Sequence, residues 1–388
     1  MTADEVSRAW AYLSRVAEPP CPELAALVAS VGPVAAAERV RRGAVDDELA
    51  RHTESRRHID CAADDLELLA RRGGRLITPD DDEWPVLAFA AFGGARLRSR
   101  GGPPLVLWAL GPARLDEVAQ RAAAVVGTRA ATTYGEHVAG DLATGLAEHD
   151  VVVVSGGAYG IDGAAHRAAL ACDGLTVAVL AGGLDIPYPA GHSALLHRIA
   201  QDGLLFSEYP PGVRPARHRF LTRNRLVAAV TGAVVVVEAG LRSGAANTAA
   251  WARALGRVVA AVPGPVTSSA SAGCHLLIRN GAQLVTRPAD VVELVGHIGE
   301  LAEEEPRPTT ALDRLSEAER QVYEALPGRG AATVDEIAVA SGLAPASVFG
   351  PLAMLEVAGL VQRREGRWRL VRPGAAQATA GRAPMRLV

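Results

Sequence analysis

Short apolar runs rich in β-branched residues recur through the middle of the chain, and helical stretches lie between most of them. Runs that are apolar throughout, without alternation, are typical of strands buried on both faces. Strands that alternate with helices predict an α/β fold with a doubly wound, mainly parallel sheet. Its strand-to-helix loops gather along one edge, where ligands bind. The predicted strands are residues 105–110, 123–127, 151–155, 176–182, 204–208, 233–239, 257–263 and 282–285.

The residues that precede the predicted strands have a different hydrophobic pattern. Residues 1–75 carry apolar positions at helical spacing without strand alternation, which predicts a helical N-terminal module. Inside it, Gly32 and Pro33 separate two helical runs. That arrangement fits a helix-hairpin-helix element whose second helix can hold a phosphate, and it also fits an ordinary helix–helix turn. Residues 76–104, rich in Asp, Pro and Gly, are expected to be a connecting region within a domain that spans 76–298.

The residues that follow the last predicted strand indicate a second domain. Residues 299–311 are acidic and then proline-bearing, as expected of a linker. Three helical segments and a short hairpin then predict a winged helix at 312–372. Its candidate recognition helix, 344–359, holds no basic or amide residue, so this domain is expected to bind protein rather than to read DNA. The tail, 373–388, is expected to be disordered.

The charge balance limits where a nucleic acid could bind. The 388 residues carry a formal net charge of −3, so no global basic field indicates a nucleic-acid partner. All 40 of the Lys and Arg residues are arginine. A GC-rich genome explains this bias, but each planar guanidinium still suits phosphate contacts and stacking on bases. A nucleic-acid site must therefore be a local arginine patch.

The cysteines and the apolar stretches indicate the cellular setting. The 4 cysteines lie far apart and form no Cys-x-x-Cys pair, which argues against a zinc cluster and suits a reducing compartment. No uninterrupted run of about 18 apolar residues occurs, and the first residues lack the layout of a signal peptide. A cytoplasmic protein with no membrane segment, no metal and no cofactor is expected.

A strand, a glycine turn and a small-residue helix follow one another in "VVVVSGGAYGIDGAAHRAAL", residues 151–170. This order is typical of phosphate sites, because a helix N-terminus offers backbone N–H groups. The dinucleotide fingerprint is incomplete, because Ser155 stands at its first glycine position and no acidic residue ends the next strand. A nicotinamide cofactor is therefore not expected. Asp162 is expected to cap the helix.

Two further segments suit a nucleic-acid backbone. Gly127, Thr128 and Arg129 follow a predicted strand, so Arg129 is expected to project into the same crevice. Residues 216–226 gather arginines around an aromatic ring, which suits a single strand because cations track phosphates while a ring stacks a base. A solvated basic face around a core phenylalanine is the alternative. The cluster consists of Arg217, Arg219, Arg223 and Arg225 with Phe220 and Asn224.

Seven runs within residues 125–285 together resemble the DNA-processing protein A family, DprA or Smf. The resemblance implies an extended Rossmann-like domain that binds single-stranded DNA and forms homodimers. It also implies that the protein protects incoming DNA and helps load a RecA-type recombinase in natural transformation, with no established catalytic activity. The helical module and the winged helix match the family in kind only. The runs are "VVGTRAATTYG", "VVVVSGGAYGIDGAAHRAAL", "AGGLDIPYPAGHSALLHRI", "LLFSEYPPG", "FLTRNRLVAA", "VVEAGLRSGAANTAAWARALGRVVAAVPGPV" and "SAGCHLLIRNGAQLV".

The resemblance also implies which residues contact DNA. Tyr159 departs from the family pattern, since arginine is common there, and a ring replaces that cation. His192 and His275 stand where asparagine is more common, and Ala245-Ala246 where Ser-Leu is common; these departures bear on affinity rather than fold. The expected DNA-contacting residues are Gly127, Thr128, Arg129, Ser155, Gly156, Gly157, Tyr159, Gly160, Arg217, Phe220, Arg223, Asn224 and Arg225.

Two other functions fit parts of the sequence. A nucleotide-hydrolysing enzyme would use Glu238 at a strand end, or Asp162 and His166 as an acid–base pair on one helix face. Both residues also fit structural roles. Glu238 can be a carboxylate that holds a loop backbone, and His166 can be a surface residue with satisfied hydrogen bonds. A regulator of double-stranded DNA would instead use the winged helix, and the charge of its recognition helix discriminates that function.

Overall fold

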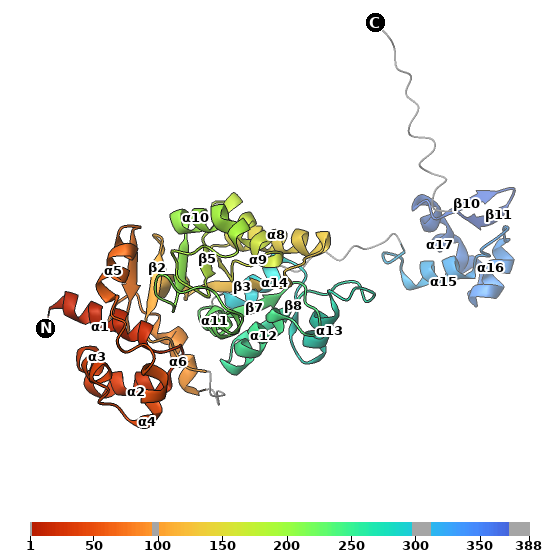
Figure 1. Cartoon of the computed structure of the whole chain (residues 1–388). Coiled ribbons are helices and arrows are strands. Elements are labelled where there is room, and N and C mark those ends of the chain that lie inside the picture. The colour runs from red at the N-terminus through yellow and green to blue at the C-terminus, as the bar shows by residue number, and fades with distance from the viewer. Residues whose placement is uncertain (1, 95–100, 297–311, 372–388) are drawn as a thin grey trace, which may run out of the picture. The chain divides into compact units, whose positions relative to one another are not determined.

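The computed structural model describes residues 2–94, 101–296 and 312–371 (Figure 1). The chain divides into two compact units, Met1–Glu303 and Glu304–Val388, and each is described by itself. The predicted linker, 299–311, and the predicted tail, 373–388, lie outside the described residues. Within the described ranges no single helix is long and apolar enough to cross a membrane. One bent pair, Val334–Ser341 with Pro345–Val357, passes that test by length and composition only.

A sheet of nine strands forms the centre of the described part of the first unit, in the order β1-β2-β6-β5-β4-β3-β7-β8-β9 (Figure 1). From β6 to β9 in this order, neighbouring strands are parallel, whereas β1 pairs with β2 and β2 with β6 in antiparallel fashion. The predicted mainly parallel sheet is therefore confirmed. The strands are β1 Gly74–Ile77, β2 Leu107–Leu110, β3 Ala122–Val126, β4 Val152–Ser155, β5 Thr176–Val179, β6 Leu204–Ser207, β7 Ala233–Val236, β8 Val258–Ala261 and β9 Gln283–Leu284.

The stretch predicted to be only a connection, 76–104, instead completes a strand and contains a helix. Strand β1 pairs along the edge of the sheet with β2, and α6, Val86–Gly94, packs Phe89 and Phe92 into the core. Most residues of β1 are only half-buried because the strand lies at an edge. Its hydrophobic pattern is correspondingly weak, which is why the sequence does not reveal it.

Helices cover both faces of the sheet. Ala124 and Val126 of β3 belong to the core beneath α11 and α12, whereas Ala123 and Val125 belong to the core beneath α8 and α9. Because every residue of β3 is buried, the strand is apolar throughout, as a strand covered on both faces should be. The helices of this part are α7 Leu115–Val118, α8 Thr133–Glu148, α9 Ile161–Ala171, η1 Ala190–His192, α10 Ser193–Asp202, α11 Arg217–Ala229, α12 Gly244–Ala254, α13 Ala272–Arg279 and α14 Pro288–Val295.

Five described helices precede β1, which confirms the helical prediction for that segment. They share a core with the sheet, since Leu13 and Leu24 cluster with Trp108 and Leu205. The indole Nε1 of Trp108 also donates to the hydroxyl of Ser14 at 3.3 Å. The helical module is therefore packed onto the first unit rather than folded apart from it. The helices are α1 Ala3–Val16, α2 Pro22–Val31, α3 Pro33–Arg42, α4 Asp47–Thr53 and α5 Ala62–Ala70.

The second unit contains, in its described residues, three helices followed by an antiparallel hairpin, as predicted for a winged helix. Leu352 of α17 and Trp368 of the hairpin lie in its small core. Phe349, Met354 and Val357 of α17 are exposed, so this helix presents apolar rather than basic side chains to solvent. The elements are α15 Glu317–Ala325, α16 Val334–Ser341, α17 Pro345–Val357, β10 Val361–Arg364 and β11 Arg367–Leu370.

Candidate nucleic-acid interface

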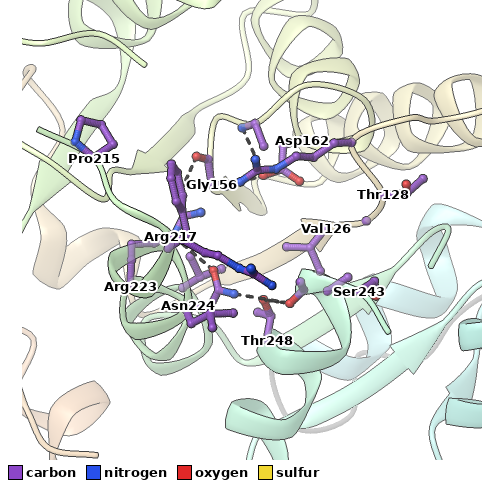
Figure 2. A pocket seen from close by; sticks show the side chains of 18 of the residues that line it. Val126, Thr128, Gly156, Asp162, Pro215, Arg217, Arg223, Asn224, Ser243 and Thr248 are labelled. Atoms are coloured by element: carbon purple, nitrogen blue, oxygen red, sulfur yellow. Dashed lines mark hydrogen bonds between the residues drawn. The ribbon is translucent and has the colours of Figure 1, made fainter. Parts of the chain in front are cut away.

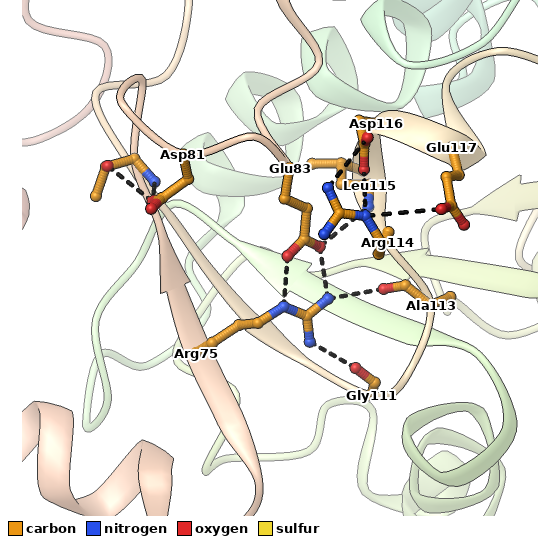
Figure 3. Close-up of polar contacts among 10 residues, drawn as sticks. Arg75, Asp81, Glu83, Gly111, Ala113, Arg114, Leu115, Asp116 and Glu117 are labelled. Atoms are coloured by element: carbon orange, nitrogen blue, oxygen red, sulfur yellow. Dashed lines mark hydrogen bonds and ion pairs between the residues drawn. The ribbon is translucent and has the colours of Figure 1, made fainter.

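The loops after β3, β4 and β7 open into one cleft with a volume of about 790 Å³ (Figure 2). Residues of α11 as far as Val227, the start of α12, Tyr188 after β5 and Pro215 after β6 complete its walls. Loops that follow parallel strands meet at one edge of a sheet, so the cleft lies where the strand pattern predicts it. Of the residues expected to contact DNA, the structure places at this cleft Gly127, Thr128, Arg129, Gly156, Arg217, Phe220, Arg223 and Asn224.

The glycine turn between β4 and α9 satisfies its own hydrogen bonds. The carboxylate Oδ2 of Asp162 accepts from the backbone N–H of Gly156 at 3.1 Å and of Ala158 at 3.3 Å. The hydroxyl of Ser155 donates to the carbonyl oxygen of Val125 at 2.7 Å. Asp162 therefore closes the loop that precedes α9 instead of capping the helix, and Gly160 stands at the N-cap. The N–H groups of Gly156 and Ala158 are therefore not free to bind a phosphate.

Arg223 fastens this loop to the neighbouring strand. Its side chain is 5% exposed, and its Nη1 donates to the carbonyl oxygens of Gly156, at 2.8 Å, and Val179. A Cβ at Gly156 would come within 2.3 Å of Arg223 Nη2, so glycine is required for this approach. Burial lowers the pKa of Arg223 to about 10, although the Asp162 carboxylate acts in the opposite direction. Arg223 thus positions the floor of the cleft while contributing positive charge to it.

A cation and two aromatic rings form a contiguous group at the cleft. The guanidinium carbon of Arg129 lies 4.9 Å from the centroid of the Phe220 ring. The ring of Tyr188 lies 5.5 Å from that of Phe220, tilted by 48°. Phe220 is half-buried, whereas Tyr188 is 44% exposed and lines the same cleft. The sequence did not single out Tyr188, because its position depends on the fold of the segment between β5 and α10.

Three arginines of the cleft are free to bind a ligand. Arg129 follows β3, Arg217 opens α11, and Arg242 lies between β7 and α12. All three are exposed, and none makes a hydrogen bond or ion pair within the described residues. Arg242 is absent from the residues predicted to contact DNA. Arg129 was predicted because it follows a strand that ends at this edge of the sheet. The same criterion would have selected Arg242, which follows β7.

Asn224 links α11 to the start of α12. Its Nδ2 donates to the carbonyl oxygen of Gly244 at 3.4 Å and to Oδ1 of Asn247 at 3.2 Å. The hydroxyl of Ser243 caps α12 by accepting from the N–H of Ala246. Figure 2 shows Asn224, Ser243 and Thr248 on the side of the cleft opposite Asp162. This wall is therefore held in place by polar contacts between two helices.

The structure corrects two predicted members of the arginine cluster. Arg225 is fully buried, and its Nη2 lies 2.6 Å from Oε1 of Glu208, so it cannot contact DNA. The Arg219 guanidinium donates to Glu18 of the helical module, with Nε 2.7 Å from Oε1. Residues of a helix spaced by two point to different sides, so α11 directs Arg223 to the cleft and Arg225 to the core.

Four other residues expected at the interface lie outside the cleft lining. Ser155, at the end of β4, and Gly157, in the loop after it, are buried, and Gly160 packs where a Cβ would meet the Thr128 carbonyl oxygen at 2.3 Å. The Tyr159 ring is exposed, but it packs edge-on against His192 with centroids 4.7 Å apart. Ser155, Gly157 and Gly160 therefore shape the loop rather than line the cleft.

The candidate catalytic residues are engaged in structural contacts. Glu238 accepts from the N–H of Thr132 at 2.9 Å and from its hydroxyl at 2.7 Å, so it holds a loop backbone. His166 is buried rather than on the surface, and its hydrogen bonds are only partly satisfied: Nδ1 lies 2.7 Å from the Thr176 hydroxyl, whereas Nε2 has no partner among the described residues. Burial lowers its pKa to about 3. Over the described ranges, no group of three or more His, Cys, Asp or Glu residues is arranged to hold a metal.

Comparisons with known families match both units. The family model for DNA recombination-mediator protein A matches residues 75–296, and the model for the DprA winged helix domain matches residues 305–367. The chain is 81% identical over 387 residues to the Mycobacterium tuberculosis (strain H37Rv) protein named "Putative DNA processing protein DprA". That match covers 99% of this chain and 100% of the relative.

Streptococcus pneumoniae supplies a further relative and a solved structure. The DNA processing protein DprA of strain R6 is 45% identical over 169 residues, which are 44% of this chain and 60% of that protein. The X-ray structure of DprA from Streptococcus pneumoniae superposes with a TM-score of 0.60 at 30% identity, covering 75% of this chain and 97% of that one. The sequence match therefore covers less than half of this chain, and the structural match covers three quarters of it.

Proposed function

This chain belongs to the DNA recombination-mediator protein A family, and on that premise we propose that it binds single-stranded DNA in the cleft at the sheet edge. The observation that carries the proposal is the convergence of Arg129, Arg217 and Arg242 on that cleft without hydrogen-bond or ion-pair partners among the described residues. Three unpaired guanidinium groups from three elements suit a ligand that offers several phosphates in succession.

The charge of the cleft is not cancelled from within. Asp162 is the carboxylate among its lining residues, and two backbone N–H groups engage its Oδ2. Figure 2 shows Asp162 across the cleft from Arg217 and Asn224. Arg223 adds a further cation beside Asp162. The net positive field attracts a polyanion and raises its rate of association.

The form of the site favours a single strand over a duplex. A major groove is usually read by a protruding helix or ribbon, whereas these arginines line a recess between loops. A flexible strand can bend into such a recess and place bases against aromatic rings. The helix that a winged helix would insert into a groove, α17, carries Glu356 as its one charged residue. This argues against the double-stranded DNA regulator.

We infer that the site binds DNA without reacting with it. Catalysis needs an acid or base whose proton can reach the substrate. Glu238 and Asp162 are each occupied by loop N–H groups, and His166 is buried with its Nδ1 at the Thr176 hydroxyl. The arrangement therefore supports a DNA-binding protein over the nucleotide-hydrolysing enzyme.

The wider role we propose is recombination mediation in the cytoplasm, where a single strand entering the cell is protected and passed to a RecA-type recombinase. The description of the matching family as a recombination mediator supports this step. We also propose that the protein acts as a homodimer in natural transformation. Sedimentation of the purified protein, and RecA filament assembly on a coated strand with and without it, test these two parts.

Fluorescence anisotropy with single- and double-stranded oligonucleotides of equal length tests the DNA proposal. We expect tighter binding to the single strand. The slope of log affinity against log salt should be about −2, because each arginine–phosphate contact on a single strand contributes about −0.7. Equal affinity for both forms, or a slope near zero, would contradict the proposal. Release of phosphate from added nucleotides would support the enzyme instead.

A further inference from the structure

We propose that Tyr188, and not Phe220, is the ring on which a base of the bound strand stacks, and that Phe220 positions the guanidinium of Arg129. This inference rests on the proposed binding of single-stranded DNA. It reverses the roles that the sequence predicts, where Phe220 is the stacking ring of the arginine cluster.

The ring of Phe220 is already occupied. The Arg129 guanidinium lies over it at 4.9 Å from the ring centroid, within the range of a cation–π contact. The Tyr188 ring packs against it at 5.5 Å. A base stacks on an open aromatic face, and Phe220 is half-buried between a cation and a second ring. Its contacts instead hold Arg129 at the cleft.

Tyr188 differs from the other exposed tyrosines of this unit. Tyr134 is 40% exposed, but its hydroxyl donates to the carbonyl oxygen of Pro263 at 2.6 Å, outside the cleft. Tyr159 is 47% exposed, and its hydroxyl accepts from the N–H of Gly191 at 3.2 Å, also outside the cleft. Tyr188 is 44% exposed, lines the cleft, and makes no hydrogen bond within the described residues.

The group Tyr188–Phe220–Arg129 therefore offers two different contacts at its two ends. Arg129 presents a cation for a phosphate, and Tyr188 presents an aromatic surface for a base. Phe220 lies between them and fixes their relative positions. A nucleotide carries both a phosphate and a base, so a strand that passes through the cleft can satisfy both ends at once.

Two probes of equal length separate the roles of the two rings: a deoxythymidine oligonucleotide and an abasic oligomer that keeps the sugars and phosphates. Tyr188→Ala should weaken binding of the thymidine strand by about 5- to 150-fold, the range for loss of one stacked base. It should change binding of the abasic strand by less than about twofold, since stacking involves no phosphate. Phe220→Ala should weaken binding of both strands by the same factor and make the salt slope shallower.

Tyr134→Ala is the matched control and should bind both strands as the unchanged protein does. Tyr188→Phe keeps the ring and should bind the thymidine strand as the unchanged protein does, whereas Tyr188→Leu should bind it more weakly. If Tyr188→Ala fails to fold, the Phe and Leu variants test the role of the ring in its place. An equal loss on both strands for Tyr188→Ala, or a loss confined to the thymidine strand for Phe220→Ala, would overturn the inference. If the unchanged protein shows no preference for single strands, the proposed function itself is wrong.

Discussion

Nη2 of Arg225 donates to Oε1 of Glu208 at 2.6 Å, and neither side chain reaches solvent. The pair is incompletely satisfied, because Glu208 Oε2 and two further nitrogens of Arg225 have no partner. Arg225 also lies over the Phe92 ring, 5.6 Å from its centroid. This arginine of α11 therefore belongs to the core that joins α6 to the sheet.

Arg225→Leu should lower the free energy of unfolding by about 3–5 kcal/mol, because it leaves a buried carboxylate without its counter-charge. The variant that also carries Glu208→Leu should recover most of that loss, since an apolar pair of similar volume avoids the desolvation cost of the ions. Urea denaturation, monitored by circular dichroism, measures the free energy of unfolding of both variants. Unchanged stability in the single variant would show that the pair contributes nothing to the fold.

Arg129, Arg217 and Arg242 should each contribute one ionic contact to DNA. Replacing any one of them by alanine should weaken single-strand binding and make the salt slope shallower by about 0.7. Arg198→Ala is a suitable control, because Arg198 is an exposed arginine paired with Asp202 outside the cleft. Affinity titrations over a series of salt concentrations give these slopes. If the three cleft variants retain the slope of the unchanged protein, the strand binds elsewhere.

His166 should make the protein less stable as the pH falls. Burial holds the pKa of His166 at about 3, below its ordinary value of 6.5, so between these values the unfolded chain binds a proton that the folded chain does not. The contribution of His166 is therefore fully present above about pH 6.5 and decreases by about 1.4 kcal/mol for each pH unit below it.

The comparison with His166→Asn isolates this effect from the titration of carboxylates. Between about pH 7 and pH 5, the free energy of unfolding of the unchanged protein should fall by about 2 kcal/mol more than that of the variant. Denaturant unfolding of both proteins at the two pH values provides the measurement. A constant difference between them would mean that the folded protein binds the proton at an ordinary pKa.

The winged helix should not be the main DNA-binding element. A chain ending at residue 303, which retains the whole first unit and its core, should bind single strands within a few-fold of the full chain. The reason is that α17 exposes Phe349, Met354 and Val357 and carries no basic residue, although Arg363 and Arg367 lie on the hairpin. A loss of about a hundredfold, or about 2.7 kcal/mol, with the remaining unit still folded by circular dichroism, would place the site in the second unit.

The sheet and its ligand edge could be predicted because buried parallel strands are apolar along their whole length. Predicted strands such as 151–155 and 233–239, which the structure buries along their whole length, therefore stand out as apolar runs, whereas the half-buried β1 does not. Individual contacts were harder to predict. Composition places Arg223 and Arg225 in one cluster, but helix geometry directs Arg223 to the floor of the cleft and Arg225 into the core, and both are buried. The role of Asp162 depends on a loop conformation that spacing alone does not specify.

The hydrogen bonds from the N–H groups of Gly156 and Ala158 to Asp162 affect which ligands the proposed site can bind. Because these N–H groups already donate to Asp162, the turn has fewer free backbone N–H groups of the kind that bind a single phosphate group in many proteins. Phosphate contacts are left to the exposed arginine side chains Arg129, Arg217 and Arg242, which come from three different segments of the chain. A free nucleotide engages few of them, whereas a polymer spans them all. We therefore expect free nucleotides to compete weakly with a single strand for the cleft, because a longer strand engages more of the arginines.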